Sequence, residues 1–210
     1  MFTGIIEDIG TIQSIKKNTK SQTMTISSKI LEDVKLGDSI ATNGLCLTVT
    51  KLTPNTFDVD VMVESMNRSN FGDLRIGSPV NLEKAMRMGD RFGGHMVSGH
   101  IDGVGIIKSH KKEENATWIT IEVPQSLRKY MTMKGSISID GISLTIANIT
   151  SEGVQVSIIP HTKDQTTLLS KKVGDKVNLE MDMMVKYVET LIKHDDKTLD
   201  EETLKHYGYK

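Results

Sequence analysis

The chain has 210 residues, and 26 Lys and Arg stand against 27 Asp and Glu, so its net charge of −1 argues against the strongly basic surface of a nucleic-acid-binding protein. A single cysteine, Cys46, excludes a disulfide within the chain and fits a reducing compartment. No apolar run approaches the roughly 18 residues that span a bilayer, and the acidic N-terminus does not resemble a signal peptide, so we expect a cytoplasmic protein with no membrane partner.

In chain order, the predicted elements are mostly short strands. Alternating polar and apolar residues predict strands, and turn signals separate them. A short helix is predicted over 125–131, in a connection. Many short strands at near-regular spacing favour an all-β fold with a small closed barrel in each half. The predicted strands cover 23–27, 46–52, 56–64, 118–123, 137–146 and 153–159.

The end of the chain departs from this pattern, because apolar residues there recur at helical spacing. This spacing of apolar residues predicts an amphipathic helix whose apolar face needs a partner. Thr198 followed three residues later by Glu201 predicts a capping box and a second short helix. Two interpretations stay open: the helix docks on its own barrel, or it associates with other subunits. The apolar set is Met184, Val185, Val188, Leu191 and Ile192.

An internal repeat divides the chain. "NGLCLTV", from Asn43, returns as "DGISLTI", from Asp140, and "VNLE" occurs twice at the same spacing of 97 residues. That period is the length of a small domain and too long for a solenoid repeat. We predict two similar domains that arose by duplication, residues 1–95 and 96–192, followed by a helical tail over 184–210 that overlaps the second.

The repeated strand has two different faces, because successive side chains of a strand point to opposite sides. The apolar side chains of this strand should fill the core of each barrel. The small polar side chains then lie outside, where they form either a ligand platform or ordinary solvated surface. Nothing basic adjoins Cys46 in sequence, so we interpret it as a group that lines a site and not as a thiol nucleophile. We expect Leu45, Leu47, Val49, Ile142, Leu144 and Ile146 to point inward and Cys46, Thr48, Thr50, Ser143 and Thr145 to point outward.

The junction "GGHMVSGHIDG", residues 93–103, carries two histidines, His95 and His100. They lie five residues apart, so on one extended strand they point to opposite faces, and no Cys or acidic partner has zinc-like spacing. We expect no metal. The glycines do not form a dinucleotide fingerprint, because Lys108 stands where the third glycine is required.

Together, the start "MFTGIIE", the paired strands, this junction and the later "VNLEMD" resemble the riboflavin synthase family over about residues 1–192. The resemblance implies two six-stranded Greek-key barrels, each binding 6,7-dimethyl-8-ribityllumazine. It implies a homotrimer associated through C-terminal helices, with active sites between the first barrel of one subunit and the second barrel of a neighbour. It implies a transferase that dismutates two lumazines per active site to riboflavin and 5-amino-6-(ribitylamino)uracil, the last step of riboflavin biosynthesis. Neither metal nor organic cofactor is implied, and lumazine synthase is a further possible partner.

The resemblance also carries over site residues, position by position. The first pocket would use Gly4, Ile5, Ile6, Cys46, Leu47, Thr48, Asp60, Val61, Met62, Val63, Glu64 and Ser65. The second would use Gly99, His100, Ile101, Lys134, Ser143, Leu144, Thr145, Ile158, Ile159, Pro160, His161, Thr162 and Lys163. The positions tied to activity are Phe2, Ser39, Cys46, His100, Thr145 and Asp182.

These residues suggest roles. His100 is the natural proton-transfer group, since a histidine titrates near neutral pH, and Asp182 is a base or orients a hydroxyl. The chain departs from the family pattern at Leu45, where some members have a second cysteine, and at His161, where others have Glu. An alternative function is that of the related lumazine-binding fluorescent antenna proteins, which bind a chromophore without catalysis.

Overall fold

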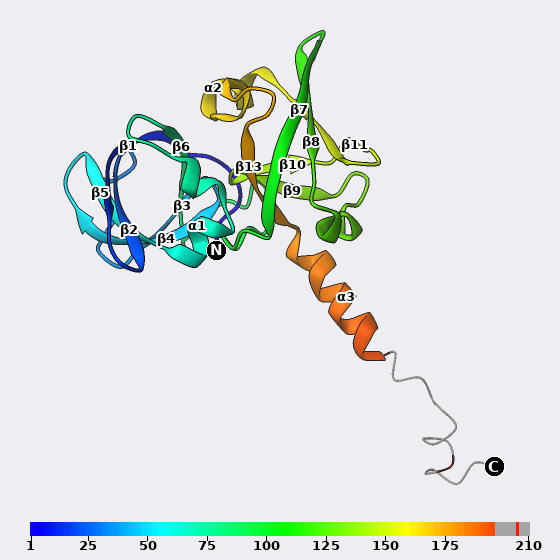
Figure 1. Ribbon diagram of the computed structural model, residues 1–210, viewed down its shortest axis with the longest axis horizontal. Helices are drawn as coiled ribbons and strands as arrows, with labels where there is room; N and C mark the ends of the chain where they lie inside the picture. The colour runs from blue at the N-terminus through cyan, green and yellow to red at the C-terminus, as the bar shows by residue number, and fades with distance from the viewer. Residues whose placement is uncertain (196–204, 206–210) are drawn as a thin grey trace.

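The two halves of the chain form two β-sheets that lie side by side, and a helix projects from the second (Figure 1). The computed structural model describes residues 1–195 and residue 205, so the capping box predicted at Thr198 lies outside the described residues. Within the described part, no helix combines the length and the apolar character that crossing a membrane requires.

The first half is a closed six-stranded barrel in the order β1-β2-β5-β4-β3-β6, with neighbouring strands antiparallel. This order is a Greek key, and closure leaves the sheet without a free edge. Two short helical turns follow β5. The bounds are β1 (Asp8–Lys17), β2 (Ser21–Ser27), β3 (Ser39–Thr42), β4 (Leu45–Leu52), β5 (Thr56–Met62), α1 (Val63–Asn67), η1 (Asn70–Asp73) and β6 (Pro79–Lys84).

The second half repeats this order but in seven strands, β10-β9-β13-β7-β8-β12-β11. The helix predicted over 125–131 is present as the 3-10 helix η2. The bounds are β7 (Gly103–Glu113), β8 (Ala116–Glu122), η2 (Gln125–Tyr130), β9 (Ser136–Ile139), β10 (Ile142–Thr145), β11 (Asn148–Ile149), β12 (Gly153–Ile158), α2 (Pro160–Gln165), η3 (Leu168–Ser170), β13 (Lys176–Met181) and α3 (Met183–Asp195).

The expected all-β tandem architecture is confirmed, and the second half departs from a six-stranded barrel in one detail: β10 and β11 together occupy the place of β4. In β4 the register shifts at Thr50, whose hydroxyl donates to the carbonyl of Asp58 on β5 at 3.1 Å and so holds the irregular strand together. The equivalent residue is Ala147, which has no hydroxyl, and here the strand is interrupted.

The alternation predicted for the repeated strand is confirmed in both halves. Leu45, Leu47 and Val49 are buried in the first core, whereas Cys46 is half-buried and Thr48 and Thr50 are exposed. The second half follows the same rule, with the side chains of Ile142, Leu144 and Ile146 in its core and those of Ser143 and Thr145 outside.

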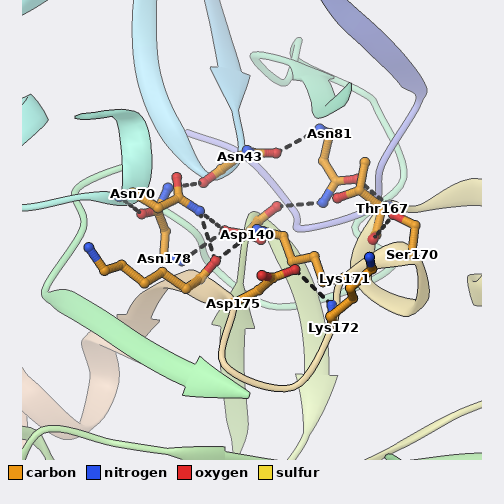
Figure 2. A network of polar contacts seen from close by, with 11 residues as sticks. Asn43, Asn70, Asn81, Asp140, Thr167, Ser170, Lys171, Lys172, Asp175 and Asn178 are labelled. Atoms are coloured by element: carbon orange, nitrogen blue, oxygen red, sulfur yellow. Dashed lines mark hydrogen bonds and ion pairs between the residues drawn. The ribbon is translucent and has the colours of Figure 1, made fainter. Parts of the chain in front are cut away.

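The halves meet around an approximate twofold axis, where buried amide side chains cross from one half to the other (Figure 2). Asn81 Nδ2 donates to the carbonyl of Asp140 at 2.9 Å, and Asn178 Nδ2 donates to the carbonyl of Asn43 at 2.9 Å. Each side chain thereby satisfies a backbone group in the other half, where an unmade bond would be costly.

One position breaks the symmetry of this network with a charge. Asp140, the counterpart of Asn43, is completely buried, and burial raises the pKa of its carboxyl group. Its Oδ2 lies 2.9 Å from Nζ of Lys171, and its Oδ1 accepts from the backbone N–H of Asn178 at 2.7 Å. The residue in the first half that corresponds to Lys171 is Leu74, so the charged pair replaces a neutral one.

The C-terminal helix α3 does not dock on its own barrel through its apolar face, so that interpretation is wrong. Polar contacts fasten the helix, among them Lys186 Nζ to Asp102 Oδ2 at 2.9 Å. Val185 is half-buried, but the other apolar side chains remain open to solvent, with Leu191 69% and Ile192 61% exposed.

The charged pair at the twofold axis yields a stability prediction. Lys171→Leu should lower the free energy of unfolding by about 3–5 kcal/mol, because it leaves a buried carboxylate unpaired. Lys171→Leu with Asp140→Asn, which copies the Asn and Leu of the first half, should recover most of this loss in urea denaturation. Because burial raises the pKa of Asp140, the loss in the single variant should also shrink as the pH falls and the carboxyl is protonated. A double variant no more stable than Lys171→Leu at neutral pH would contradict this account.

Candidate functional site

The two outward strand faces are completed by segments that are exchanged between the halves. The backbone N–H of Ser143 donates to the carbonyl of Gly4 at 2.8 Å, and that of Cys46 donates to the carbonyl of Gly99 at 2.8 Å. The start of the chain therefore lies on the strand of the second half, and the start of the second half lies on the strand of the first.

Glycine is required at both crossing points. Gly4 and Gly99 have φ of +77° and +84°, which L side chains rarely adopt. A Cβ on Gly4 would lie 2.6 Å from Cβ of Ser143, and a Cβ on Gly99 would lie 2.5 Å from Cβ of Cys46. Direct backbone contact between segment and strand is thus possible only with glycine.

A buried glutamate at the base of each segment holds it in place. Glu83 Oε1 accepts from the backbone N–H of Thr3 at 2.6 Å, and Oε2 accepts from that of Gly4 at 2.9 Å. Glu180 Oε1 accepts from the backbone N–H of Ser98 at 2.6 Å in the same way. Burial raises the pKa of both carboxyl groups, and the donated hydrogen bonds oppose that rise.

This geometry corrects the expected grouping of the site residues. The family resemblance groups the segments 4–6 and 99–101 with the strands of their own halves, but each lies on the strand of the other half. Ile6 packs against the second core and Ile101 against the first. An alignment of the two repeats pairs equivalent positions but does not say which strand each segment covers.

We call the first surface the Cys46 face; it consists of residues 46–48, 60–65 and 99–101. Leu47 and Val61 lie in the barrel core, so only their backbones border this face. Thr48 is exposed, and Met62, from the neighbouring strand, is 55% exposed. The face thus combines hydroxyl and thiol groups with open apolar surface, a mixture typical of sites for flat organic ligands.

The second surface, the Ser143 face, consists of residues 4–6, 134, 143–145 and 158–163. Leu144 and Ile158 are core residues, whereas Thr145 is exposed. Ile5 and Ile159 are 48% and 58% exposed and provide the apolar part. Lys134 is exposed, in a left-handed conformation with φ of +63°, and its N–H donates to the carbonyl of Ile146 at 2.9 Å.

The residues proposed for activity are distributed over both faces. His100 is exposed on the Cys46 face, and Thr145 is exposed on the Ser143 face. Asp182 is half-buried and accepts the N–H of Met184 at Oδ1, 2.9 Å away, so it also caps α3.

Phe2 and Ser39 lie between the two faces. Phe2 is fully buried, exchanges two backbone hydrogen bonds with Val97, and packs with Ala41 beside Cys46, so it anchors the exchanged segments. Ser39, opposite Thr48 on β3, lines a cavity of about 540 Å³ that also includes Ile5, Glu83 and Lys84.

One residue of the site is missed by sequence reasoning. His95 is 7% exposed, and its Nδ1 lies 2.7 Å from Oγ of Ser143. Burial lowers the pKa of its imidazole, although Asp182 acts in the opposite direction, so the ring is neutral at pH 7. The sequence raises His95 only as a metal ligand, and within the described residues no three His, Cys, Asp or Glu side chains are grouped to hold a metal ion.

Comparisons with known proteins agree with this two-faced architecture. The family model of the lumazine binding domain matches the chain twice, over residues 3–85 and 98–182. The riboflavin synthase of Actinobacillus pleuropneumoniae is 51% identical over 193 residues, which cover 91% of this chain and 90% of that protein. The riboflavin synthase of Bacillus subtilis is 48% identical over 205 residues, with 97% and 95% covered.

Solved structures show the same fold with ligands. LumP in complex with 6,7-dimethyl-8-(1'-D-ribityl) lumazine has a TM-score of 0.78 and 28% identity, and the match covers 86% of this chain and 99% of that one. LumP in complex with riboflavin has a TM-score of 0.80 and 29% identity over the same shares.

The close contact at Gly99 can be separated from its backbone conformation. Gly77 has a similar φ of +88°, but a Cβ added there would meet nothing within 4 Å, so Gly77→Ala should cost only about 1 kcal/mol of backbone strain. Gly99→Ala should cost about 1–3 kcal/mol more, because its methyl group would overlap Cys46. Equal free energies of unfolding for the two variants would contradict the close crossing of segment and strand.

Proposed function

This chain belongs to the riboflavin synthase family, and we propose that it is a transferase that converts two molecules of 6,7-dimethyl-8-ribityllumazine to riboflavin and 5-amino-6-(ribitylamino)uracil. The observation that carries the proposal is the presence of two equivalent surfaces, the Cys46 face and the Ser143 face, in a chain 48% identical to a riboflavin synthase over 97% of its length. One lumazine would donate a four-carbon unit to the other, so two matched faces with different side chains suit the reaction.

The proposed reaction requires the protein mainly to position its two substrates. The conjugated ring acidifies the 7-methyl group of the substrate, so no strong base is required. Holding two substrates face to face can lower the barrier by about 7–11 kcal/mol. The fixed segments at Gly4 and Gly99 support this role, because glutamates and strand hydrogen bonds place them before any ligand arrives. The reaction as proposed uses neither a metal nor an organic cofactor.

His100 and Asp182 are the proposed proton-transfer pair. His100 is exposed on the Cys46 face, within reach of a ligand there. Asp182 follows β13, the strand whose Glu180 holds the segment that carries His100. Ser39, Cys46 and Thr145 would bind rings and carbonyls or position an attacking water.

We also propose that the chain acts as a homotrimer, in which the first barrel of one subunit faces the second barrel of a neighbour. Exposed apolar side chains along α3, among them Leu191 and Ile192, support association through this helix. His100 and Thr145 lie on different faces of one chain, which suits an active site shared between subunits. A cytoplasmic location and association with lumazine synthase belong to the same proposal.

A non-catalytic lumazine-binding antenna is the second candidate, because LumP has the same fold. The chain is 28% identical to LumP but 51% identical to a riboflavin synthase, which favours the enzyme.

The pure protein mixed with the lumazine should produce riboflavin, seen by its absorbance and green fluorescence. His100→Gln should still bind the lumazine but turn it over more slowly, by about 10²-fold or more if His100 transfers a proton. Stable lumazine binding by the wild type without riboflavin would support the antenna instead. Full turnover of His100→Gln at all pH values would contradict the proton-transfer role.

A chain that ends at Glu189 lacks Leu191 and Ile192 and should lose the trimer. Sedimentation of the shortened chain beside the full-length protein measures this directly. Leu191→Asp in the full-length protein is a matched variant that changes only the apolar face, and it should also weaken association, because it buries a charge. Trimers in all three proteins would contradict the role of α3.

A further inference from the structure

The reactive positions of the two faces differ in their surroundings as well as in their atoms. The Cys46 side chain packs beside Phe2, Ala41 and Val97, and its sulfur makes no hydrogen bond among the residues that the structure describes. The Ser143 hydroxyl, at the equivalent position, lies 2.7 Å from Nδ1 of His95. The face that has Ser in place of Cys therefore also has a hydrogen-bonding partner, His95, for that side chain.

His95 is held firmly in this place. Its backbone N–H donates to the carbonyl of Thr3 at 3.1 Å, and the residue is 7% exposed. A Cβ on the preceding Gly94 would overlap the carbonyl of Thr3 and lie 3.0 Å from Oγ of Ser143, so only glycine lets the chain pass this close. The geometry of the pair is thus set by backbone on both sides.

The unpartnered nitrogen of His95 indicates which way the hydrogen bond runs. Nε2 is buried and, within the described residues, has no hydrogen-bond partner. A neutral imidazole carries one N–H and one acceptor nitrogen. Leaving a buried acceptor unfilled is more common in proteins than leaving a buried N–H unpaired. The proton therefore belongs on Nδ1, which donates to Oγ of Ser143.

A hydroxyl that accepts from His95 has its own proton free for another partner. Ser143 makes no other side-chain hydrogen bond within the part of the chain that the structure describes, and its side chain is on the outward side of β10, as is that of Thr145. We propose that His95 is a positioning residue that turns the Ser143 hydroxyl into a fixed donor to a carbonyl or ring nitrogen of the ligand bound on the Ser143 face. This inference rests on the proposed function, since the ligand is the lumazine or its product riboflavin.

The Cys46 face has no equivalent device among the residues that the structure describes, where no side chain is hydrogen-bonded to the sulfur of Cys46. A thiol is also a weaker donor than a hydroxyl. One face therefore offers a directed hydrogen-bond donor to a heteroatom of the ligand, and the other offers a soft thiol at the same place. This difference lets two identical ligands be bound in unequal electronic environments.

A double-mutant cycle in the full-length protein tests the inference. His95→Leu and Ser143→Ala should each lower kcat/KM for the lumazine about tenfold, the value of one oriented hydrogen bond. The double variant should be no worse than Ser143→Ala, because His95 acts only through that hydroxyl. His95→Asn, whose amide N–H can take the place of Nδ1, should recover most of the loss. The proposal would be overturned if the losses of the two single variants multiplied in the double variant. It would also be overturned if His95→Asn folded but recovered no activity.

Two further variants keep the test decisive. Ser143→Cys copies the Cys46 face without touching His95 and should show the same loss; wild-type activity would overturn the proposal even if His95→Leu fails to fold. In a Cys46→Ala background, the effect of His95→Leu should be unchanged, because the pair belongs to the other face. The same double-mutant cycle can also be measured as riboflavin affinity, by fluorescence quenching, so that it does not depend on turnover. Wild-type protein that binds riboflavin but forms none would count against the proposed reaction alone, and the binding cycle would still decide the role of His95.

Discussion

The rest of the structure depends on the contact between the halves at the twofold axis. The turns before β4 and β10 meet so closely that a Cβ on Gly44 would lie 2.7 Å from the backbone nitrogen of Gly141. Buried amide side chains, among them Asn81 and Asn178, then close this contact by satisfying backbone carbonyls across it. Because β4 and β10 both begin at this point, the same contact sets where each strand meets the segment of the other half.

Simple periodicity predicts much of this molecule. A spacing of 97 residues indicates two related sheets, and alternation places Cys46 and Ser143 outward, because a strand has two faces wherever it lies. The exchange of segments is not predictable in this way. It depends on hydrogen bonds such as that from Ser143 to Gly4, between residues far apart in sequence, and a repeat is equally compatible with exchanged and unexchanged packing. His95 escapes detection as a site residue for a related reason, since its contact with Ser143 joins residues 48 positions apart in the sequence.

The departures from symmetry share one physical pattern. Asn43 and Asp140 keep the same backbone turn, with φ of 43° and 46°, while the side chain changes from amide to carboxylate. The duplicated backbone therefore tolerates a change of charge provided that a partner such as Lys171 compensates it. The broken strand at Ala147 is the exception, because it involves no charge: the residue lies between β10 and β11, and its backbone N–H donates to the carbonyl of Gln155 at 2.9 Å.

A reaction between two identical molecules needs unequal surroundings, and a duplicated protein begins with equal ones. The two faces differ without any disturbance of either core. Leu47 and Leu144 both stay buried, while the outward residue beside each changes from Cys46 to Ser143. Each face also receives a histidine from a different source: His100 lies in an exchanged segment, and His95 comes from the connection that joins the halves. Because a connection between two repeats exists only once, a residue within it makes one face different from the other by construction. Symmetric backbones with a single asymmetric linker thus provide a direct physical route from duplication to two distinct substrate roles.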